Sequence, residues 1–515
     1  MGVQRRQVVR GALAAAAGLW PGSRRGPDYR ALGAALDGRL VVAGDADYPM
    51  ARQLYQPRYD RIAPGAVAYP AHDGDVAVCL EFARRSGVAV VARGGGHGYA
   101  GWAVCPGLVV DVGAMAEVIP GSGEVRVGAG ARLGGVHAAL AGRGLGIPAG
   151  LCPTVGIAGL ALGGGLGVGS RAYGATSDRL TGARVVTADG IAREVDARQE
   201  PELFWALRGG GGGNFGVVTE FRFRTHAVAA CGVAELGWEA RNSAAVLAGW
   251  QRWLGALPDP LWSQVEFVLD GPAVPGPAVR IVALDGRREL DREVARLIGL
   301  VGAQPRSHHA VERGYGDTMR ALSGCLDLSP AECRLPGGLP GRDPQGRLER
   351  EDYTARSDFW AAGGLSAPAV EEVLAALGRY AAEVPAGGRG VVQFDGVCGG
   401  ALNRVAAGAT AFVHRDSAFL GQYLVYWPPG AARAEVLRHE GWLDRLWQRL
   451  RPWASGRAYQ NYADPKLTGW ARAYYGPNLP RLEQVKRVYD PGRLFSFPQA
   501  VPGGSAGRRA AVRPG

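Results

Sequence analysis

The stretch VAVVARGGGHGY at residues 88–99 decides how the N-terminal half of the chain folds. Its first five residues are an apolar run typical of a buried strand, which leads directly into three glycines and a histidine. A helical pattern over 73–86 precedes this strand, strand-like runs at 108–111 and 124–127 follow it, and a second helical pattern covers 133–141. The glycine loop is therefore expected at the end of a buried strand.

Two further glycine clusters, at 163–165 and 209–213, also lie close to expected strands. Glycine allows backbone N–H groups to close on phosphates and allows a flat ring to approach the main chain. The clusters match neither the GxGxxG of a nicotinamide-binding domain nor the GxxxxGK[ST] of a phosphate-binding loop. The region 150–169 is so rich in glycine that mostly loops and close-packed turns are expected there. Taken alone, the clusters are equally compatible with turns in a glycine-biased protein.

The chain beyond residue 226 has a different pattern. Helical patterns at 367–384 and 431–450 alternate with strand-like runs at 390–394 and 419–426. We interpret this part as a second, α+β domain. Two domains also agree with a length of 515 residues, which exceeds what one ordinary hydrophobic core supports.

Composition indicates a soluble globular protein. Hydrophobic residues make up 47% and charged residues 20%, with a mean hydropathy of −0.04. The net charge of +11 comes almost wholly from arginines that are scattered along the chain, since Lys466 and Lys486 are the only lysines. Without a compact basic block, nucleic-acid binding is disfavoured. No apolar run reaches the roughly 18–20 residues of a membrane-spanning helix, so stable membrane insertion is not expected.

The N-terminal residues resemble an export signal. Arg5 and Arg6 precede an uncharged, alanine-rich run, an arrangement typical of twin-arginine signals for proteins exported in the folded state. A basic tail is the alternative, because Gln4 stands where such signals usually have Ser or Thr. We expect a secreted or extracytoplasmic bacterial protein.

Seven cysteines occur, and none forms a CxxC pair, which disfavours zinc and iron–sulfur sites. No metal is expected. Cys325 and Cys333 enclose a short loop that an oxidising compartment would allow to close as a disulfide, the alternative being two unrelated thiols.

Several motifs occur in the order found in a known family. They are RGGGH at 93–97, GLCPTVG at 150–156, GGGLG at 163–167, SRAYG at 170–174, LRGGGGGNFG at 207–216, YQNYAD at 459–464, YGPNLPRL at 475–482 and VKRVYDP at 485–491, followed by Phe495 and Gln499. In this order they resemble the berberine-bridge-enzyme-like branch of the FAD-linked oxidases, within the vanillyl-alcohol-oxidase superfamily. The resemblance covers roughly residues 60–225 and 455–500.

The resemblance implies an α+β fold, in which an FAD-binding domain of two α/β subdomains is covered by the antiparallel sheet of a substrate domain. The expected segments are 1–28 (signal and linker), 29–225 (FAD domain), 226–455 (substrate domain), 456–505 (a return to the FAD domain) and 506–515 (tail).

The resemblance also implies a bicovalent FAD. His97 matches the histidine bonded to the 8α-methyl carbon, and Cys152 matches the cysteine bonded to ring carbon C6. An ordinary loop histidine and a buried thiol are the alternatives. The further residues expected to contact the cofactor are Arg93, Gly94, Gly95, Gly96, Gly98, Thr154, Val155, Gly156, Gly159, Gly163, Gly164, Gly165, Gly167, Tyr173, Gly213, Asn214, Gly216, Val218, Asn461 and Tyr462.

Tyr462 matches the family tyrosine that removes a proton from the substrate hydroxyl, with Asp395 and Tyr99 as alternative bases. A phenol titrates near about 10, so this role requires a cationic neighbour or a polarised network. The alternative is that Tyr462 only packs. The segment around Asp395 departs from the family pattern by an apparent insertion and by Cys398 where a tyrosine is frequent, which puts a second catalytic tyrosine in doubt.

The implied reaction is oxidation of an alcohol, lactol or sugar hydroxyl of a natural product or saccharide. Hydride passes to flavin N5, and dioxygen, for which Val155 leaves room, becomes H2O2. An oxidative ring closure and a flavin-bearing binding protein without turnover are the alternatives. The sequence does not indicate the oligomeric state.

Overall fold

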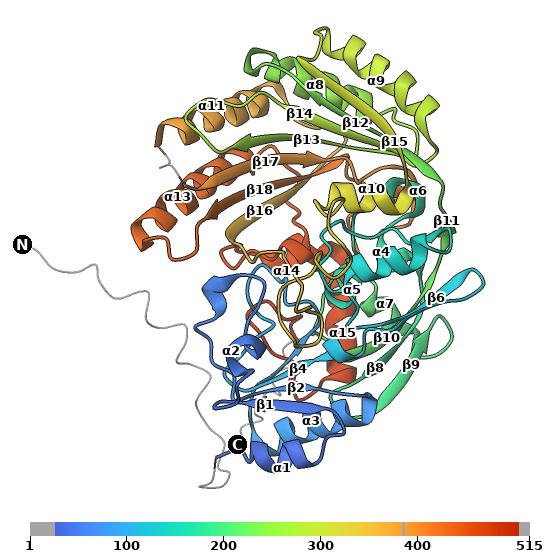
Figure 1. Cartoon of the computed structure of the whole chain (residues 1–515), viewed down its shortest axis with the longest axis vertical. Coiled ribbons are helices and arrows are strands. Elements are labelled where there is room, and N and C mark those ends of the chain that lie inside the picture. The colour runs from blue at the N-terminus through green and yellow to red at the C-terminus, as the bar shows by residue number, and fades with distance from the viewer. Residues whose placement is uncertain (1–25, 384–386, 504–515) are drawn as a thin grey trace, which may run out of the picture.

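The computed structural model describes residues 26–383 and 387–503. The twin arginine and the tail from residue 506 lie outside these residues. The described strands form four sheets, two large ones with helices packed against them and two smaller ones (Figure 1). This mixture of helices and antiparallel sheets confirms the expected α+β fold.

The first sheet contains the strand of the opening motif. Its order is β1 (Arg39–Val42), β2 (Ala66–Tyr69), β4 (Leu108–Asp111) and β3 (Val90–Arg93), with β2, β4 and β3 parallel. The helix α3 (Asp73–Ser86) connects β2 to β3, as the sequence predicts. It begins after His72, whose ring accepts the N–H of Asp75, and it ends at Gly87, whose φ of 65° is easily reached by glycine. Gly94 and the glycines after it therefore begin at the end of a buried strand.

The second sheet is antiparallel and has the order β5-β6-β10-β8-β9. Its strands are β5 (Val118–Pro120), β6 (Glu124–Gly128), β10 (Val217–Arg224), β8 (Leu180–Val186) and β9 (Ala192–Asp196). The helices of this part include α4 (Leu133–Ala141), α5 (Ile157–Leu162) and α7 (Pro201–Leu207). The predicted helix 133–141 is confirmed, whereas α5 lies in a region expected to be mostly loop.

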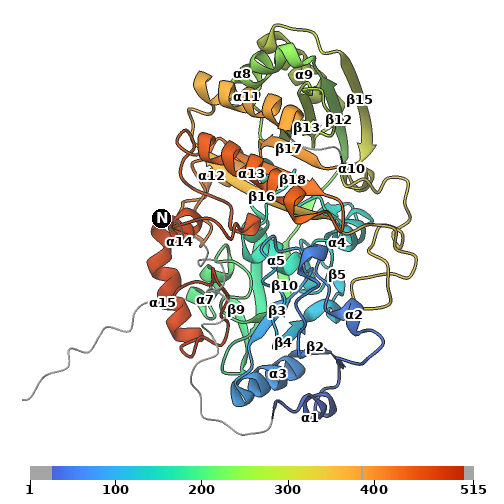
Figure 2. The same cartoon turned by 90° about the vertical axis from the view of Figure 1, so that its left-hand side faces the viewer.

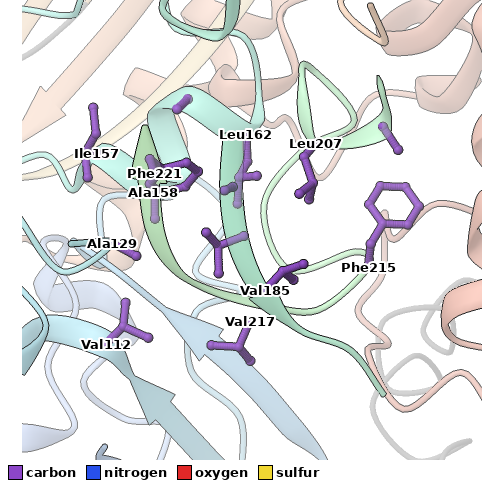
Figure 3. Packing of buried hydrophobic residues seen from close by; sticks show 14 of the residues in the cluster. Val112, Ala129, Ile157, Ala158, Leu162, Val185, Leu207, Phe215, Val217 and Phe221 are labelled. Carbon is purple, nitrogen blue, oxygen red and sulfur yellow. The ribbon is translucent and has the colours of Figure 1, made fainter. Parts of the chain in front are cut away.

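The core of this half lies between the two sheets and around α5. Figure 3 shows side chains from several elements meeting there, with Ile157 and Leu162 of α5 near Phe221 and Val185 of the second sheet. The side chain of Phe215 is 1% exposed. Burying an aromatic or aliphatic side chain of this size contributes roughly 1.5–3 kcal/mol, so this core fixes the loops that leave it.

The third sheet has seven antiparallel strands in the order β15-β12-β14-β13-β17-β18-β16. They are β12 (Ala230–Gly237), β13 (Leu261–Leu269), β14 (Ala278–Ala283), β15 (Ser307–Gly314), β16 (Asp352–Trp360), β17 (Arg389–Asp395) and β18 (Phe419–Trp427). Four helices, α8 (Ser243–Leu254), α9 (Arg287–Val301), α11 (Ala367–Glu383) and α13 (Arg433–Leu450), cover its outer face (Figure 1). The opposite face is turned toward the N-terminal half.

The last segment of the chain returns to the N-terminal half. Helix α15 (Leu479–Tyr489) packs on α7 (Figure 2). Phe495 forms a bridge with Val90 of β3. The buried ammonium of Lys486 donates to the carbonyls of Asn214 and Phe495, at 2.6 and 2.7 Å. Because a buried ammonium without partners is costly, these bonds hold the returning segment against the glycine loop before β10.

The remaining elements are short. They are α1 (Tyr29–Ala34), α2 (Tyr48–Ala51), β7 (Leu145–Gly146), α6 (Ser170–Tyr173), β11 (His226–Ala227), α10 (Tyr315–Leu322), α12 (Gly400–Arg404), α14 (Trp470–Tyr475) and the 3-10 turns η1 (Pro57–Tyr59), η2 (Val112–Ala114), η3 (Thr176–Arg179), η4 (Ala240–Asn242), η5 (Gln460–Tyr462) and η6 (Gly476–Asn478). Of the helices in the described residues, none is long and apolar enough to span a membrane. Cys325 and Cys333 form a disulfide, which confirms that prediction.

Candidate active site

A cavity of about 790 Å³ lies between the glycine loops of the N-terminal half and the third sheet. It is lined by the loop after β3, by residues of 150–168 and 211–218, by β13, β14, β17 and β18, and by the returning segment. Motifs that are several hundred residues apart in sequence therefore meet around one space. Its volume falls within the 300–1,000 Å³ range typical of ligand sites.

The loops that carry His97 and Cys152 touch through their backbones. A Cβ on Gly95 would overlap the backbone nitrogen of Gly156, and a Cβ on Gly156 would overlap that of Gly95. Neither position tolerates a side chain unless the backbone shifts. The two glycines thus bring together the loops that place the histidine and the cysteine in the lining of one cavity.

His97 is held by two neighbours. Its Nε2 lies 2.8 Å from Oγ1 of Thr154, and its ring stacks on that of Tyr55 with centroids 4.0 Å apart. Burial, and then the charge of Arg132, lower the pKa of His97 to about 3. The imidazole is therefore neutral at physiological pH, and a neutral imidazole has a nitrogen lone pair that can form a bond.

The thiol of Cys152 is open to the cavity, although the cavity itself is deep within the protein. This depth raises the pKa of the thiol, while the hydroxyl of Thr154 and the N–H groups of Thr154 and Val155 act in the opposite direction. The Sγ atom lies 3.6 Å from Oγ1 of Thr154. His97 and Cys152 thus contact the same hydroxyl, that of Thr154.

Tyr462 lies beneath the third sheet, in a group of aromatic rings. Tyr99 stacks on it with centroids 5.0 Å apart, and Tyr459 meets it edge-on at 4.9 Å. The side-chain amide of Gln422 donates to the hydroxyl of Tyr99 at 2.9 Å. This bond reaches the hydroxyl of Tyr99, whereas Tyr462 contacts both tyrosines through its ring.

Asp395 lines the same cavity, at the end of β17. The indole N–H of Trp262 donates to its carboxylate at 2.6 Å, and burial raises the pKa of Asp395 to about 7. The pKa of Tyr462 is raised well above its usual value by burial and then by Tyr99 and Asp395. The carboxyl of Asp395 thus titrates near neutral pH, whereas the phenol of Tyr462 stays protonated at that pH.

The inner face of the third sheet carries a row of polar side chains that sequence reasoning missed. Gln422 of β18 is in register with Gln393 of β17, which is in register with Glu266 of β13. The amide of Gln264 donates to Glu266 at 2.8 Å. All four residues line the cavity. Polar residues at alternate positions of otherwise apolar strands were the available signal, because alternate residues share one face of a strand.

Most of the residues expected to contact the cofactor line the cavity. They are Arg93, Gly94, Gly95, Gly96, His97, Gly98, Cys152, Val155, Gly156, Gly159, Gly167, Gly213, Asn214, Gly216, Val218, Asn461 and Tyr462, together with Tyr99 and Asp395 as alternative bases. Thr154 instead lines an adjoining cavity of about 40 Å³, in contact with His97. The guanidinium of Arg93 also pairs with the carboxylate of Asp111.

Four of the residues expected to contact the cofactor do not line the cavity. A Cβ on Gly163, Gly164 or Gly165 would overlap Asn461, Phe412 or Thr176 respectively, so this cluster allows close packing. Tyr173 stacks on His226 with centroids 3.6 Å apart and does not line the cavity.

The donor set fits FAD. Consecutive glycines at 94–96 and 211–213 line the cavity, and backbone without side chains suits a diphosphate and a flat ring. A Cβ added to Gly98 or Gly159 would meet no atom within 4 Å, so at these positions the backbone faces open space. His97 and Cys152 lie close together in the cavity lining, since both contact the hydroxyl of Thr154, and there they can hold a flavin ring.

Comparison with known proteins agrees with this geometry. Residues 64–196 match the family described as FAD binding domain, and residues 458–502 match the family described as Berberine and berberine like. The FAD-linked oxidoreductase YgaK of Bacillus subtilis is 30% identical over 478 residues, which cover 91% of this chain and 97% of the relative. The xylooligosaccharide oxidase of Thermothelomyces thermophilus is 30% identical over 474 residues, covering 86% and 89%.

Two solved structures have the same fold. Physcomitrella patens BBE-like 1 has a TM-score of 0.81 at 28% identity, covering 92% of this chain and 99% of that one. The xylooligosaccharide oxidase from Myceliophthora thermophila C1, in complex with xylobiose, has a TM-score of 0.79 at 26% identity, covering 92% and 98%. The predicted resemblance is confirmed, and the chain belongs to the berberine-bridge-enzyme-like family of FAD-linked oxidoreductases.

Proposed function

We propose that the protein is an oxidase of polyhydroxylated substrates, most simply saccharides, with FAD bonded to both His97 and Cys152. The observation that carries this proposal is the polar row Gln422, Gln393 and Glu266, which faces the cavity beside Tyr462. Amides and a carboxylate offer both donors and acceptors, as several adjacent hydroxyl groups require.

The chain's own residues supply the acid–base chemistry. We expect Tyr462 to accept the proton of the substrate hydroxyl at its phenol oxygen. Asp395 lines the same cavity, and its pKa of about 7 suits it to take up the proton that the phenol gives up. Gln422 holds Tyr99 in place, and Tyr99 holds the ring of Tyr462 through their stack. When bound, FAD would serve as the acceptor for hydride from the substrate carbon and would then reduce dioxygen to H2O2.

Relatives support the choice of substrate class. Xylooligosaccharide, chitooligosaccharide and glucooligosaccharide oxidases are 30%, 28% and 28% identical to this chain. The name of each of these relatives states that it oxidises an oligosaccharide. In this chain, the polar row lines the same cavity as Tyr462 and Asp395, and it suits the same class of ligand.

Mixing the purified protein with a panel of saccharides and simple alcohols tests the proposal. We expect at least one saccharide to bleach the flavin absorbance without air, and readmitted air to restore the absorbance with stoichiometric H2O2. Bleaching by simple alcohols alone would contradict the saccharide assignment, and bleaching by a saccharide without peroxide on readmission of air would contradict the oxidase assignment.

We also propose that the chain is exported through its twin arginine. The disulfide between Cys325 and Cys333 supports an oxidising destination. Replacing Arg5 and Arg6 with lysines should retain the protein inside the cell, whereas equal export of both forms, measured in cell fractions, would refute this route.

A further inference from the structure

Thr154 lies between the two residues that are proposed to bond the flavin. Its side chain is 5% exposed and sits in a turn that is closed by the N–H of Val155 donating to the carbonyl of Cys152 at 3.3 Å. Its Oγ1 lies 2.8 Å from Nε2 of His97 and 3.6 Å from Sγ of Cys152. One hydroxyl therefore contacts both attachment residues.

A hydroxyl can accept one hydrogen bond while it donates another. If Nε2 of His97 carries the hydrogen, the oxygen of Thr154 accepts it, and the hydroxyl hydrogen remains free to point at the sulfur of Cys152. Nδ1 of His97 then keeps its lone pair. The opposite orientation would place a hydrogen on Nδ1 and leave the sulfur without this donor.

We propose that Thr154 is the positioning residue for both flavin bonds: its oxygen fixes the tautomer of His97, and its hydrogen stabilises the thiolate of Cys152. The inference rests on the proposed bicovalent attachment. It assigns one residue to two bonds, and so it predicts that both bonds form more slowly when the hydroxyl is lost.

The chemistry of attachment needs both effects. The C8α–N bond replaces one C–H bond of the flavin methyl group and the N–H bond of the imidazole, and the C6–S bond replaces one ring C–H bond and the S–H bond. In each case two electrons and two protons leave, and dioxygen takes them up as H2O2. The attacking atoms are a nitrogen lone pair and a thiolate, which are the forms that Thr154 favours.

The contacts around the imidazole of His97 restrict its rotation toward another hydrogen-bond partner. Tyr55 covers one face of the ring, and the N–H of Tyr55 donates to the carbonyl of Gly96 at 3.0 Å, directly before His97. The hydroxyl of Tyr55 donates to Glu351, which pairs with Arg389 of the third sheet. Ring and backbone are thus held together, and Nε2 stays directed at Thr154.

The test compares Thr154→Val, which keeps the branched shape, with Thr154→Ser, which keeps the hydroxyl. Thr219→Val is the matched control, because Thr219 is buried on β10, does not line the cavity, and has only a long contact of 3.4 Å to the carbonyl of Arg184. FAD is added to flavin-free protein, samples are denatured at intervals, and peptides that contain His97 or Cys152 are weighed. Tightly bound but non-covalent flavin is measured in parallel, and Thr154→Ala serves as a second hydroxyl-free variant.

We expect both bonds to form at least tenfold more slowly in Thr154→Val and Thr154→Ala, and near the wild-type rate in Thr154→Ser and Thr219→Val. Loss of only one bond, or wild-type rates in a hydroxyl-free variant that binds FAD, would overturn the shared role. If the wild-type protein itself forms neither bond, the proposed attachment fails. If both the wild type and Thr154→Val form both bonds at the same rate, the attachment stands and only the role of Thr154 fails.

Discussion

The ring of Tyr99 lies almost flat on the ring of Tyr462, with an interplanar angle of 5° and centroids 5.0 Å apart. Tyr99 comes from the loop after β3 and Tyr462 from the returning segment, so the stack joins two segments that are distant in sequence. Because Gln422 of the third sheet holds the hydroxyl of Tyr99, three separate parts of the fold fix the plane of the proposed base.

Replacing Tyr462 with Phe keeps the stack and removes the hydroxyl. We expect substrate to reduce the flavin about 10²- to 10⁴-fold more slowly, the usual contribution of a positioned general base. Reoxidation by air should hardly change, because we expect it to depend on access near Val155 and not on a phenol. Stopped-flow measurement separates the two half-reactions. Flavin reduction within threefold of wild type, with the flavin spectrum intact, would move the base to Asp395 or Tyr99.

Asp395 should set the pH dependence of flavin reduction. Since burial raises its pKa to about 7, the carboxyl becomes able to take a proton as the pH rises through neutrality, and the rate should rise with it. Asp395→Asn should be slower by about 10²-fold and should lose this inflection. A variant that keeps the wild-type pH profile would exclude Asp395 from the proton path.

The same shift predicts a change in stability. The pKa of Asp395 is higher in the folded protein than the usual 3.8, so the folded state binds the proton more tightly. Its contribution is therefore present at low pH and is lost as the pH rises from about 4 to about 7. The free energy of unfolding of wild type relative to Asp395→Asn should fall across this range in denaturant titrations. A constant difference would show that the carboxyl is not shifted.

Each proposed flavin bond should survive loss of the other. His97→Ala and Cys152→Ala should each keep flavin on the denatured protein, and only the double variant should release all of it. The measurement is flavin fluorescence in acid-precipitated protein. Complete release from either single variant would contradict two independent bonds.

Gly156→Ala should destabilise the protein, because the added Cβ would overlap the backbone nitrogen of Gly95. We expect a loss of about 1–3 kcal/mol, as for overpacked cores, and reduced flavin attachment. Gly135→Ala is the control, since Gly135 lies exposed in α4 with nothing within 4 Å of an added Cβ. It should be neutral or stabilise by up to about 1 kcal/mol. Equal thermal stability of the two variants would refute the close contact of the loops.

The disulfide between Cys325 and Cys333 should stabilise by about 2–3 kcal/mol, the range for closing a short loop. Replacing both cysteines with serine should lower the midpoint of unfolding, and a reductant should lower the wild-type midpoint to match. Peptide mapping under non-reducing conditions gives the direct check. Finding both thiols alkylated in unreduced exported protein would contradict the bond.

The sequence determined the elements whose signals are local. The helix at 73–86 has a polar cap, a glycine end and a regular apolar face, and the structure contains it with the same bounds. The loop at 94–97 follows a short apolar strand, as β3 confirms. The family resemblance likewise depended only on the order of motifs. Such features depend on neighbours a few residues away, which a single chain displays directly.

Only the tertiary structure decided which of these residues meet. The glycines at 163–165 look like those at 94–96, yet the former pack against Asn461, Phe412 and Thr176, which are distant in sequence. The register of three strands placed Gln422, Gln393 and Glu266 in one row, and a shift by one residue would turn each to the opposite face. The pKa of Asp395 depends on burial that the whole fold creates. Contacts, register and burial are properties of segments brought together by packing, so they become definite only once the chain is folded.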